Sequence, residues 1–178
     1  MGDILLVTGR PGAGKTTLIR SLADALGSRA GGFYTEEIRE SGERKGFRLV
    51  TLDGRSAVFA HVELLPRTAL RVGRYGVDTS VLERLGLSAV RQAAGRRQVV
   101  LVDEIGKMEL LSPAFCRVLD EVASGPAPIV ATITRSQHPW ADAFKIRPQA
   151  EVLELTPANR QQVLGATRTW LRGRGLLG

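Results

Sequence analysis

The sequence is poor in cysteine, histidine and aromatic residues, and each shortage argues against a class of protein or site. Cys116 is the only cysteine among 178 residues, so no internal disulfide can form and we expect a reducing, cytoplasmic location. The two histidines, His61 and His138, have no cysteine or histidine neighbours at ligand spacing, which argues against a histidine metal site. Aromatic residues make up 5% of the chain, and no basic run contains interleaved aromatics, which argues against a surface that binds single-stranded nucleic acid by stacking.

Long apolar runs are also missing. No stretch approaches the roughly 18 apolar residues of a membrane-spanning helix, and the first residues lack the basic segment of a signal peptide. Apolar residues are 43% and charged residues 24% of the chain, which is typical of a globular protein, so we expect residues 1–178 to form a single domain. The net charge is +7, and 21 of the 25 basic residues are arginine, so a nucleic acid partner is compatible with the charge but no motif supports it.

Short apolar runs alternate with amphipathic segments along most of the chain. The apolar runs predict buried strands at 3–9, 98–103, 129–134 and 151–155. The amphipathic segments predict helices at 15–26 and 78–94, one that starts at Ser112-Pro113, and one from Thr156-Pro157 to Arg172. This alternation predicts an α/β fold with a mostly parallel sheet and helices on both faces, and such sheets bind ligands beyond the carboxyl ends of their strands.

One segment departs from this alternation. Gly27 and the pair Gly31-Gly32 interrupt the pattern after the first helix, and candidate strands follow at 33–39, 46–52 and 56–62. The turn residues at 40–43 and the dipeptide Asp53-Gly54 are signals for hairpins between these strands. We therefore expect an antiparallel insertion near residues 33–62.

Residues 9–16 match the spacing G-x-x-x-x-G-K-[ST] between a predicted strand and a predicted helix. Glycines allow such a loop to point successive backbone N–H groups inward, which forms a nest for anions at a helix N-terminus. Lys15 would contact the β- and γ-phosphates, and the Thr16 hydroxyl would bind Mg²⁺. We expect this P-loop to bind a nucleoside triphosphate through Gly9, Arg10, Pro11, Gly12, Ala13, Gly14, Lys15, Thr16 and Thr17.

The apolar strand predicted at 98–103 ends in two carboxylates. Asp103 would lie near the Mg²⁺ of the P-loop and hold it through water, as the acidic residue of a Walker B motif does. Glu104 follows, one residue beyond the predicted strand, and is our candidate for the general base that activates the attacking water.

Other charged side chains have two open interpretations each. Arg135 follows the strand at 129–134 and Arg160 lies near the start of the last helix, so each is either an arginine finger or a surface residue. Lys107 and Glu109 either form an ion pair with each other or are solvated. The predicted insertion adds two candidates that face either the substrate or solvent, Glu36 and Arg39.

The chain resembles the small nucleoside-triphosphatase family first described from thermophiles, whose relatives include a human cancer-related nucleoside triphosphatase. The resemblance runs from about residue 4 to 165 and is carried by GRPGAGKTT, GGFYTEEIRESGERKGFRLVTLDG, VVLVDEIGKMELLSPAF and LTPANR. It implies a RecA-like P-loop core, Mg²⁺ dependence, and slow hydrolysis of several triphosphates with little base selectivity. Many relatives have a histidine or similar residue where this chain has Thr134-Arg135. The resemblance implies a second nucleotide-binding stretch at Val99, Val100, Leu101, Val102, Asp103, Glu104, Ile105 and Gly106.

These observations predict a Mg²⁺-dependent nucleoside triphosphatase that releases the γ-phosphate of ATP, GTP, CTP or UTP to water. The expected catalytic residues are Lys15, Asp103 and Glu104, with Arg135 as a further candidate. A phosphoryl transferase acting on a nucleotide, nucleoside or polynucleotide, and a nucleotide-dependent nucleic-acid-binding switch, remain alternatives on the same core. Because the P-loop and both carboxylates come from one chain, we expect a monomer to suffice.

Overall fold

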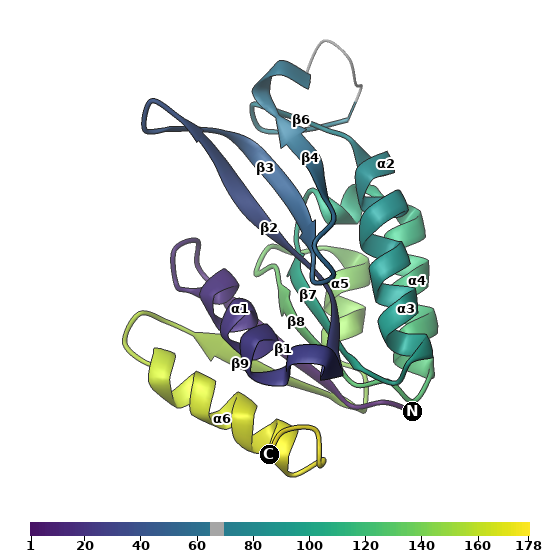
Figure 1. Cartoon of the computed structure of the whole chain (residues 1–178). Helices are drawn as coiled ribbons and strands as arrows, with labels where there is room; N and C mark the ends of the chain where they lie inside the picture. The colour runs from purple at the N-terminus through teal and green to yellow at the C-terminus, as the bar shows by residue number, and fades with distance from the viewer. Residues whose placement is uncertain (65–69) are drawn as a thin grey trace.

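The computed structural model describes residues 1–64 and 70–178, and within these residues the strands form one nine-stranded sheet (Figure 1). The order across the sheet is β5-β6-β4-β3-β2-β7-β8-β1-β9. The strands are β1 Ile4–Gly9, β2 Ala30–Glu40, β3 Glu43–Thr51, β4 Ser56–His61, β5 Arg71–Val72, β6 Tyr75–Val77, β7 Val99–Ile105, β8 Ile129–Ile133 and β9 Ala150–Leu155.

The half of the sheet from β2 to β9 is parallel. Next to the edge strand β9, Ile4 of β1 pairs with Ile129 of β8 on one side and with Ala150 of β9 on the other. The helices α1 Lys15–Leu26 and α6 Arg160–Arg172 cover one face, and α3 Ser88–Gly95 and α4 Pro113–Ser124 cover the other (Figure 1). The predicted α/β class, with a mostly parallel sheet and helices on both faces, is confirmed.

The other half of the sheet is an antiparallel extension, formed by residues 33–64 and 70–77. The outer part of β2 pairs with β3, and β4, β6 and β5 continue the antiparallel order. The extension reaches further than the insertion predicted near 33–62 because two very short strands, β5 and β6, follow it. Gly31-Gly32 lies inside β2 and does not interrupt the strand. A Cβ on Gly31 would collide with Ala93, and one on Gly32 would collide with the Leu101 carbonyl. These glycines let β2 approach β7 closely.

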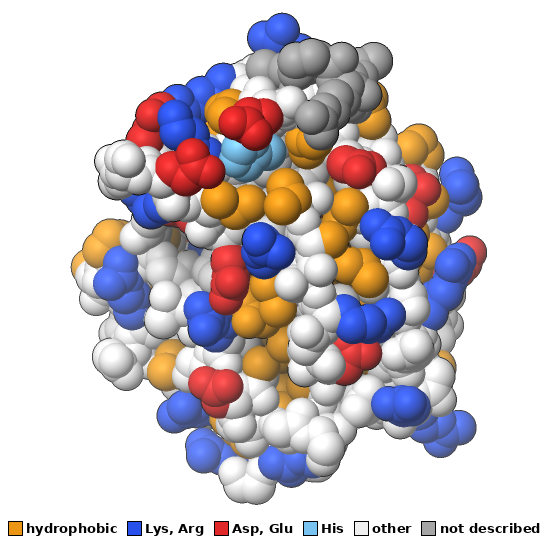
Figure 2. Space-filling model, turned by 45° about the horizontal axis from the view of Figure 1, so that its top comes forward, with side chains coloured by type: hydrophobic (Ala, Val, Ile, Leu, Met, Phe, Trp, Pro, Cys, Tyr) orange, Lys and Arg blue, Asp and Glu red, His pale blue; other side chains and the backbone are white. Residues whose placement is uncertain are grey.

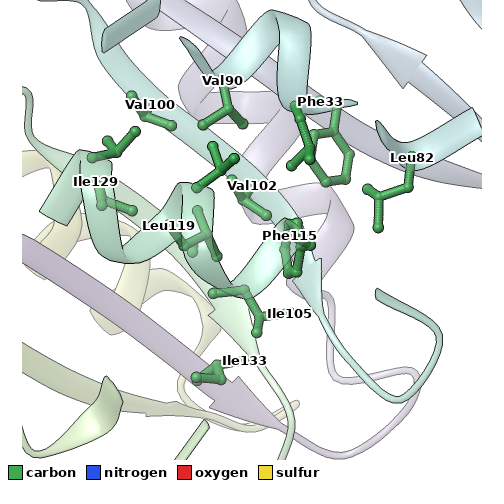
Figure 3. Close-up of a cluster of buried hydrophobic side chains, with 14 of the residues drawn as sticks. Phe33, Leu82, Val90, Val100, Val102, Ile105, Phe115, Leu119, Ile129 and Ile133 are labelled. Carbon is green, nitrogen blue, oxygen red and sulfur yellow. The ribbon is translucent and has the colours of Figure 1, made fainter. Parts of the chain in front are cut away.

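Two apolar clusters fill the space between the sheet and its helices. One lies under α3 and α4 and includes Phe33 and Phe115, whose ring centroids are 6.3 Å apart in an edge-to-face arrangement (Figure 3). Gly86 lies against Phe33, so a larger residue in this helical turn would displace the ring. The other cluster lies under α1 and α6 and includes Leu22 and Trp170. The clusters hold the carboxyl ends of the parallel strands in fixed positions.

The helices agree with the sequence patterns apart from three differences. Helical structure covers the predicted range 78–94, but it is not one regular α-helix: a π-helical turn, Leu82–Leu87, joins α2 Thr79–Val81 to α3. The last helix begins at Arg160 instead of Thr156, because Asn159 accepts a hydrogen bond from the Thr156 N–H and closes a turn first. An unpredicted helix, α5 Pro139–Lys145, follows β8. In the described parts of the chain, no helix combines the length and apolar character needed to cross a bilayer.

Candidate active site

The loop between β1 and α1 has the backbone conformation of an anion nest. Gly12 and Gly14 have φ values of 78° and 110°, in the left-handed region where a side chain would be strained. The Ala13 N–H donates to the Arg10 carbonyl and closes the loop. In the described part of the chain, no side chain caps the N-terminus of α1, so its first N–H groups remain available to an anion.

Lys15, the first residue of α1, places its ammonium at the mouth of this loop. The Nζ atom donates to the carbonyls of Gly9 at 2.9 Å and Arg10 at 3.2 Å. The same Nζ lies 3.6 Å from Oε2 of Glu104, so the P-loop and the end of β7 are joined by an ion pair. The ammonium therefore lies between the phosphate nest and the second carboxylate of the site.

Asp103 is almost completely buried, with 1% of its surface exposed, and it is fixed by two hydroxyl groups. Thr16 Oγ1 donates to Oδ2 and Thr132 Oγ1 donates to Oδ1, each at 2.7 Å. Burial raises the pKa of Asp103, and the two hydrogen bonds and the Lys15 charge act in the opposite direction. A hydroxyl and a carboxylate oxygen side by side suit Mg²⁺, which prefers oxygen ligands and retains several waters. The residues present thus fit this ion.

Glu104 lies within β7, not beyond its end, with its side chain 35% exposed, and the buried Glu109 lies nearby. A Cβ built on Gly106 would lie 2.6 Å from Oε1 of Glu104 and 3.1 Å from Oε2 of Glu109, so both carboxyl groups adjoin this glycine. Glu109 Oε2 accepts a hydrogen bond from the Gly106 N–H at 3.0 Å. Burial and the Glu104 charge raise the pKa of Glu109 to about 8. Burial also raises the pKa of Glu104, while Lys15 lowers it.

These contacts correct one expectation and reveal a missed residue. Lys107 and Glu109 do not form the ion pair that we considered: Lys107 is exposed, and Glu109 is buried against the backbone. Thr132 was not predicted as a site residue because it lies in an apolar strand. It is the single polar residue in the run IVATI, and this could have indicated a role at the site. Thr132 therefore holds Asp103, and Glu109 lies close enough to Glu104 for its charge to act on it.

Two arginines, Arg135 after β8 and Arg160 at the start of α6, lie at the site. Arg160 donates from Nε to the Ala13 carbonyl at 2.7 Å and from Nη2 to the Gly12 carbonyl at 3.0 Å, so it clamps the P-loop from outside. Arg135 is about half exposed and lies 3.6 Å from Glu154. Both line the central cleft.

The predicted nucleotide-binding stretch Val99–Gly106 divides into buried and accessible residues. Only Asp103 and Glu104 of this stretch line the cleft, whereas Val99 to Val102 and Ile105 are buried in the two apolar clusters. The P-loop residues from Gly9 to Thr17 line the cleft apart from Ala13, which is buried. Of the two candidates in the extension, Glu36 lines the cleft and lies 3.6 Å from Arg20, whereas Arg39 pairs with Glu37 and does not line it.

The cleft has a volume of about 1580 Å³ and lies at the carboxyl ends of the parallel strands, where such sheets bind ligands. It extends from the P-loop past Glu104 to the antiparallel extension. The phosphate nest, the lysine, the Mg²⁺-compatible oxygens and two glutamates therefore open onto one space.

Comparisons with known proteins agree with this geometry. A family model described as NTPase matches residues 4–167. The nucleoside-triphosphatase THEP1 of Thermotoga petrophila is 45% identical over 160 residues, which are 90% of this chain and 88% of that protein. THEP1 of Aquifex aeolicus is 38% identical over 169 residues, covering 90% of this chain and 94% of that protein.

Two solved structures share the fold. The crystal structure of THEP1 from Aquifex aeolicus superposes with a TM-score of 0.84 at 36% identity and covers 94% of this chain and 98% of its own. The solution structure of a human cancer-related nucleoside triphosphatase gives a TM-score of 0.79 at 34% identity, with coverages of 97% and 98%. The resemblance drawn from the sequence is confirmed, and the chain belongs to the NTPase family that includes these P-loop proteins.

Proposed function

We propose that this protein is a Mg²⁺-dependent nucleoside triphosphatase that transfers the γ-phosphoryl group of ATP, GTP, CTP or UTP to water. The observation that carries the proposal is the position of Glu104, whose carboxylate lies 3.6 Å from the P-loop lysine and opens onto the same cleft. A base in this position adjoins the place where a γ-phosphate bound by Lys15 would lie.

The residues divide the work of binding and catalysis. The N–H groups of the P-loop bind the phosphate oxygens, and Lys15 exchanges its contacts with the loop carbonyls for the γ-phosphate, where charge grows in the transition state. Thr16 and Asp103 would hold Mg²⁺, which when bound neutralises charge on the β- and γ-phosphates. Glu104 orients a water and accepts its proton, and burial strengthens its basicity by raising its pKa.

We expect low base selectivity because the site residues that we identify would contact the phosphates and Mg²⁺ and not the base. The groups that converge at the P-loop bind phosphates and Mg²⁺, and the cleft beyond them is wide. A site that hydrogen-bonds one base edge rejects other bases by a factor of about 10⁴–10⁵, and we assign no such contact here. Because Lys15, Thr16, Asp103 and Glu104 come from one chain, a monomer is sufficient for this chemistry.

A nucleic acid partner has less support. The chain carries a net charge of +7, but on the face shown in Figure 2 basic and acidic side chains of the described residues are interspersed. Mixed charge of this kind does not provide the continuous basic surface that follows a phosphate backbone.

The test is phosphate release from ATP, GTP, CTP and UTP, each with Mg²⁺ and with EDTA. We expect kcat/KM values within about tenfold of one another, and no turnover with EDTA. A preference above about 10³ for one base would refute the low selectivity. Full activity in EDTA would refute the roles of Thr16 and Asp103.

A further inference from the structure

The cleft is larger than a single nucleotide requires. Pockets for one small molecule enclose about 300–1,000 Å³, and this cleft encloses about 1580 Å³. A water nucleophile needs only about 30 Å³. The P-loop and Lys15 line one part of the cleft, and residues of the antiparallel extension line a second part.

This second part of the cleft, which we call the distal compartment, is lined by Glu37, Phe47, Phe59, Val72, Tyr75 and Met108. Phe59 and Tyr75 belong to the apolar cluster under α3 and α4, and Phe47 and Met108 pack against it. The P-loop side of the cleft instead adjoins the cluster under α1 and α6, which includes Val7 and Ala13. The two parts of the cleft are therefore built on different clusters, and Glu104 lines the same cleft.

A cluster of one guanidinium and two aromatic rings, Arg44, Phe47 and Tyr75, forms one wall of the distal compartment. The rings of Phe47 and Tyr75 meet edge to face at 70° with centroids 5.5 Å apart. Tyr75 is only 8% exposed, and the Arg74 guanidinium lies 5.4 Å from its centroid. The Arg44 guanidinium lies 5.2 Å from the Phe47 centroid and 5.9 Å from the Tyr75 centroid. Arg44 donates to the Tyr75 hydroxyl at 3.0 Å and to Glu37 Oε1 at 3.0 Å, which fixes its guanidinium in place. Flat aromatic and guanidinium surfaces stack with nucleobases irrespective of their sequence, because every base has a π-face.

We propose that the distal compartment binds a nucleoside, whose base stacks against Arg44 and Phe47 and whose sugar hydroxyl reaches Glu104. This inference rests on the proposed triphosphate site and adds a second activity, phosphoryl transfer to the nucleoside. The hydroxyl oxygen forms a bond to the γ-phosphorus while the bond from that phosphorus to the β-bridging oxygen breaks. The nucleoside diphosphate leaves with the bonding electrons, and the hydroxyl proton passes to Glu104.

The presence of Glu104 decides between two acceptors. A hydroxyl group loses a proton when it attacks, so a carboxylate beside it accelerates the reaction. A phosphate acceptor is already ionised at neutral pH, so it gains nothing from a general base and would be repelled by the Glu104 carboxylate. The Glu104 carboxylate therefore favours a nucleoside over a nucleoside monophosphate.

The experiment incubates the full chain with γ-³²P-labelled ATP and Mg²⁺, alone and with adenosine, guanosine, cytidine, uridine or thymidine. Free phosphate and labelled nucleoside phosphate are then separated. Glycerol serves as a hydroxyl acceptor without a ring, and AMP as a phosphate acceptor. We expect a labelled nucleoside monophosphate with at least one nucleoside, and at least about tenfold less transfer to glycerol or AMP.

Two variants tie the activity to the compartment. Phe47→Leu keeps an apolar side chain and removes the ring, so the ratio of nucleoside transfer to hydrolysis should fall about tenfold or more. Val58→Ala is the matched control, because Val58 is exposed on the same extension and does not line the cleft. It should leave the ratio unchanged.

Phosphate release without any labelled nucleoside product would overturn the second activity and leave the hydrolase intact. Equal transfer to glycerol, preferred transfer to AMP, or an unchanged ratio in Phe47→Leu would overturn the nucleoside assignment. Absence of both phosphate release and transfer would instead refute the proposed triphosphate site itself.

Discussion

Replacing Glu109 by glutamine should change the pH dependence of stability more than any surface substitution. Glu109 is 5% exposed, and burial with the nearby Glu104 charge raises its pKa from 4.5 to about 8. Glutamine has the shape of the protonated acid and keeps an oxygen that can accept the Gly106 N–H. The variant therefore retains the neutral form of the side chain at every pH.

The sign and size follow from proton linkage. Because the folded-state pKa is raised, the neutral carboxyl stabilises the folded protein fully below about pH 4.5, and this contribution is lost as the pH rises through about 8. At 1.36 kcal/mol for each pKa unit, the free energy of unfolding of the parent relative to Glu109→Gln should fall by about 4 kcal/mol between pH 5 and pH 9. Asp103 and Glu104 are present in both proteins, so the comparison between the parent and Glu109→Gln isolates Glu109.

The assay is urea unfolding at pH 5, 7 and 9, followed by tryptophan fluorescence. Glu121→Gln provides the control, because Glu121 lies on the exposed side of α4 and pairs only at 3.5 Å with Arg91. The control should differ from the parent by less than about 0.5 kcal/mol at all three pH values. If the difference between Glu109→Gln and the parent stays constant from pH 5 to pH 9, Glu109 titrates normally and its burial has been misjudged.

Three further substitutions test the support of the site. Thr132→Val removes one of the two hydroxyl donors to Asp103, so the free energy of unfolding at pH 8 should fall by about 1.5–3 kcal/mol and half-maximal hydrolysis should need more Mg²⁺. Thr132→Ser should restore both the stability and the Mg²⁺ requirement of the parent. Parental values of both in Thr132→Val would contradict the role of Thr132 in holding Asp103. Arg160→Ala removes two hydrogen bonds to the P-loop carbonyls and should raise KM for ATP about tenfold with little change in kcat. A fall in kcat of about 10²-fold at constant KM would show instead that Arg160 acts as an arginine finger. Lys15→Ala should weaken triphosphate binding in equilibrium titrations and nearly abolish phosphate release, and an equally active variant would exclude the P-loop as the catalytic centre.

The sequence predicted those parts of the fold that depend on local pattern. The buried runs at β1, β7, β8 and β9 and the amphipathic helices were recognisable because their apolar periodicity is long enough to read. Strands β5 and β6 have two and three residues, too few to show alternation. Helix α5 was missed although His138 and Pro139 supply a cap and a first-turn proline.

The site was predictable to the same extent. The spacing of the P-loop fixes Lys15 and Thr16 in relation to each other, and the end of an apolar strand places Asp103 near them. The burial of Glu109 was not predictable, because it depends on how the turn after β7 folds back against Gly106. The shape of the cleft also depends on long-range pairing, since the extension brings Phe47 and Tyr75 from distant parts of the chain.

The measurement that tests the central claim most directly compares Glu104→Gln with the parent in ATP binding and in single-turnover hydrolysis. Glutamine keeps the size of the side chain and removes its basicity, so we predict a rate about 10²- to 10⁴-fold lower with nearly unchanged affinity for Mg²⁺-ATP. Hydrolysis at the parental rate would contradict the assignment of Glu104 as general base. A loss of ATP binding equal to the loss of rate would contradict it as well, because Glu104 would then belong to the binding site of the nucleotide and its metal.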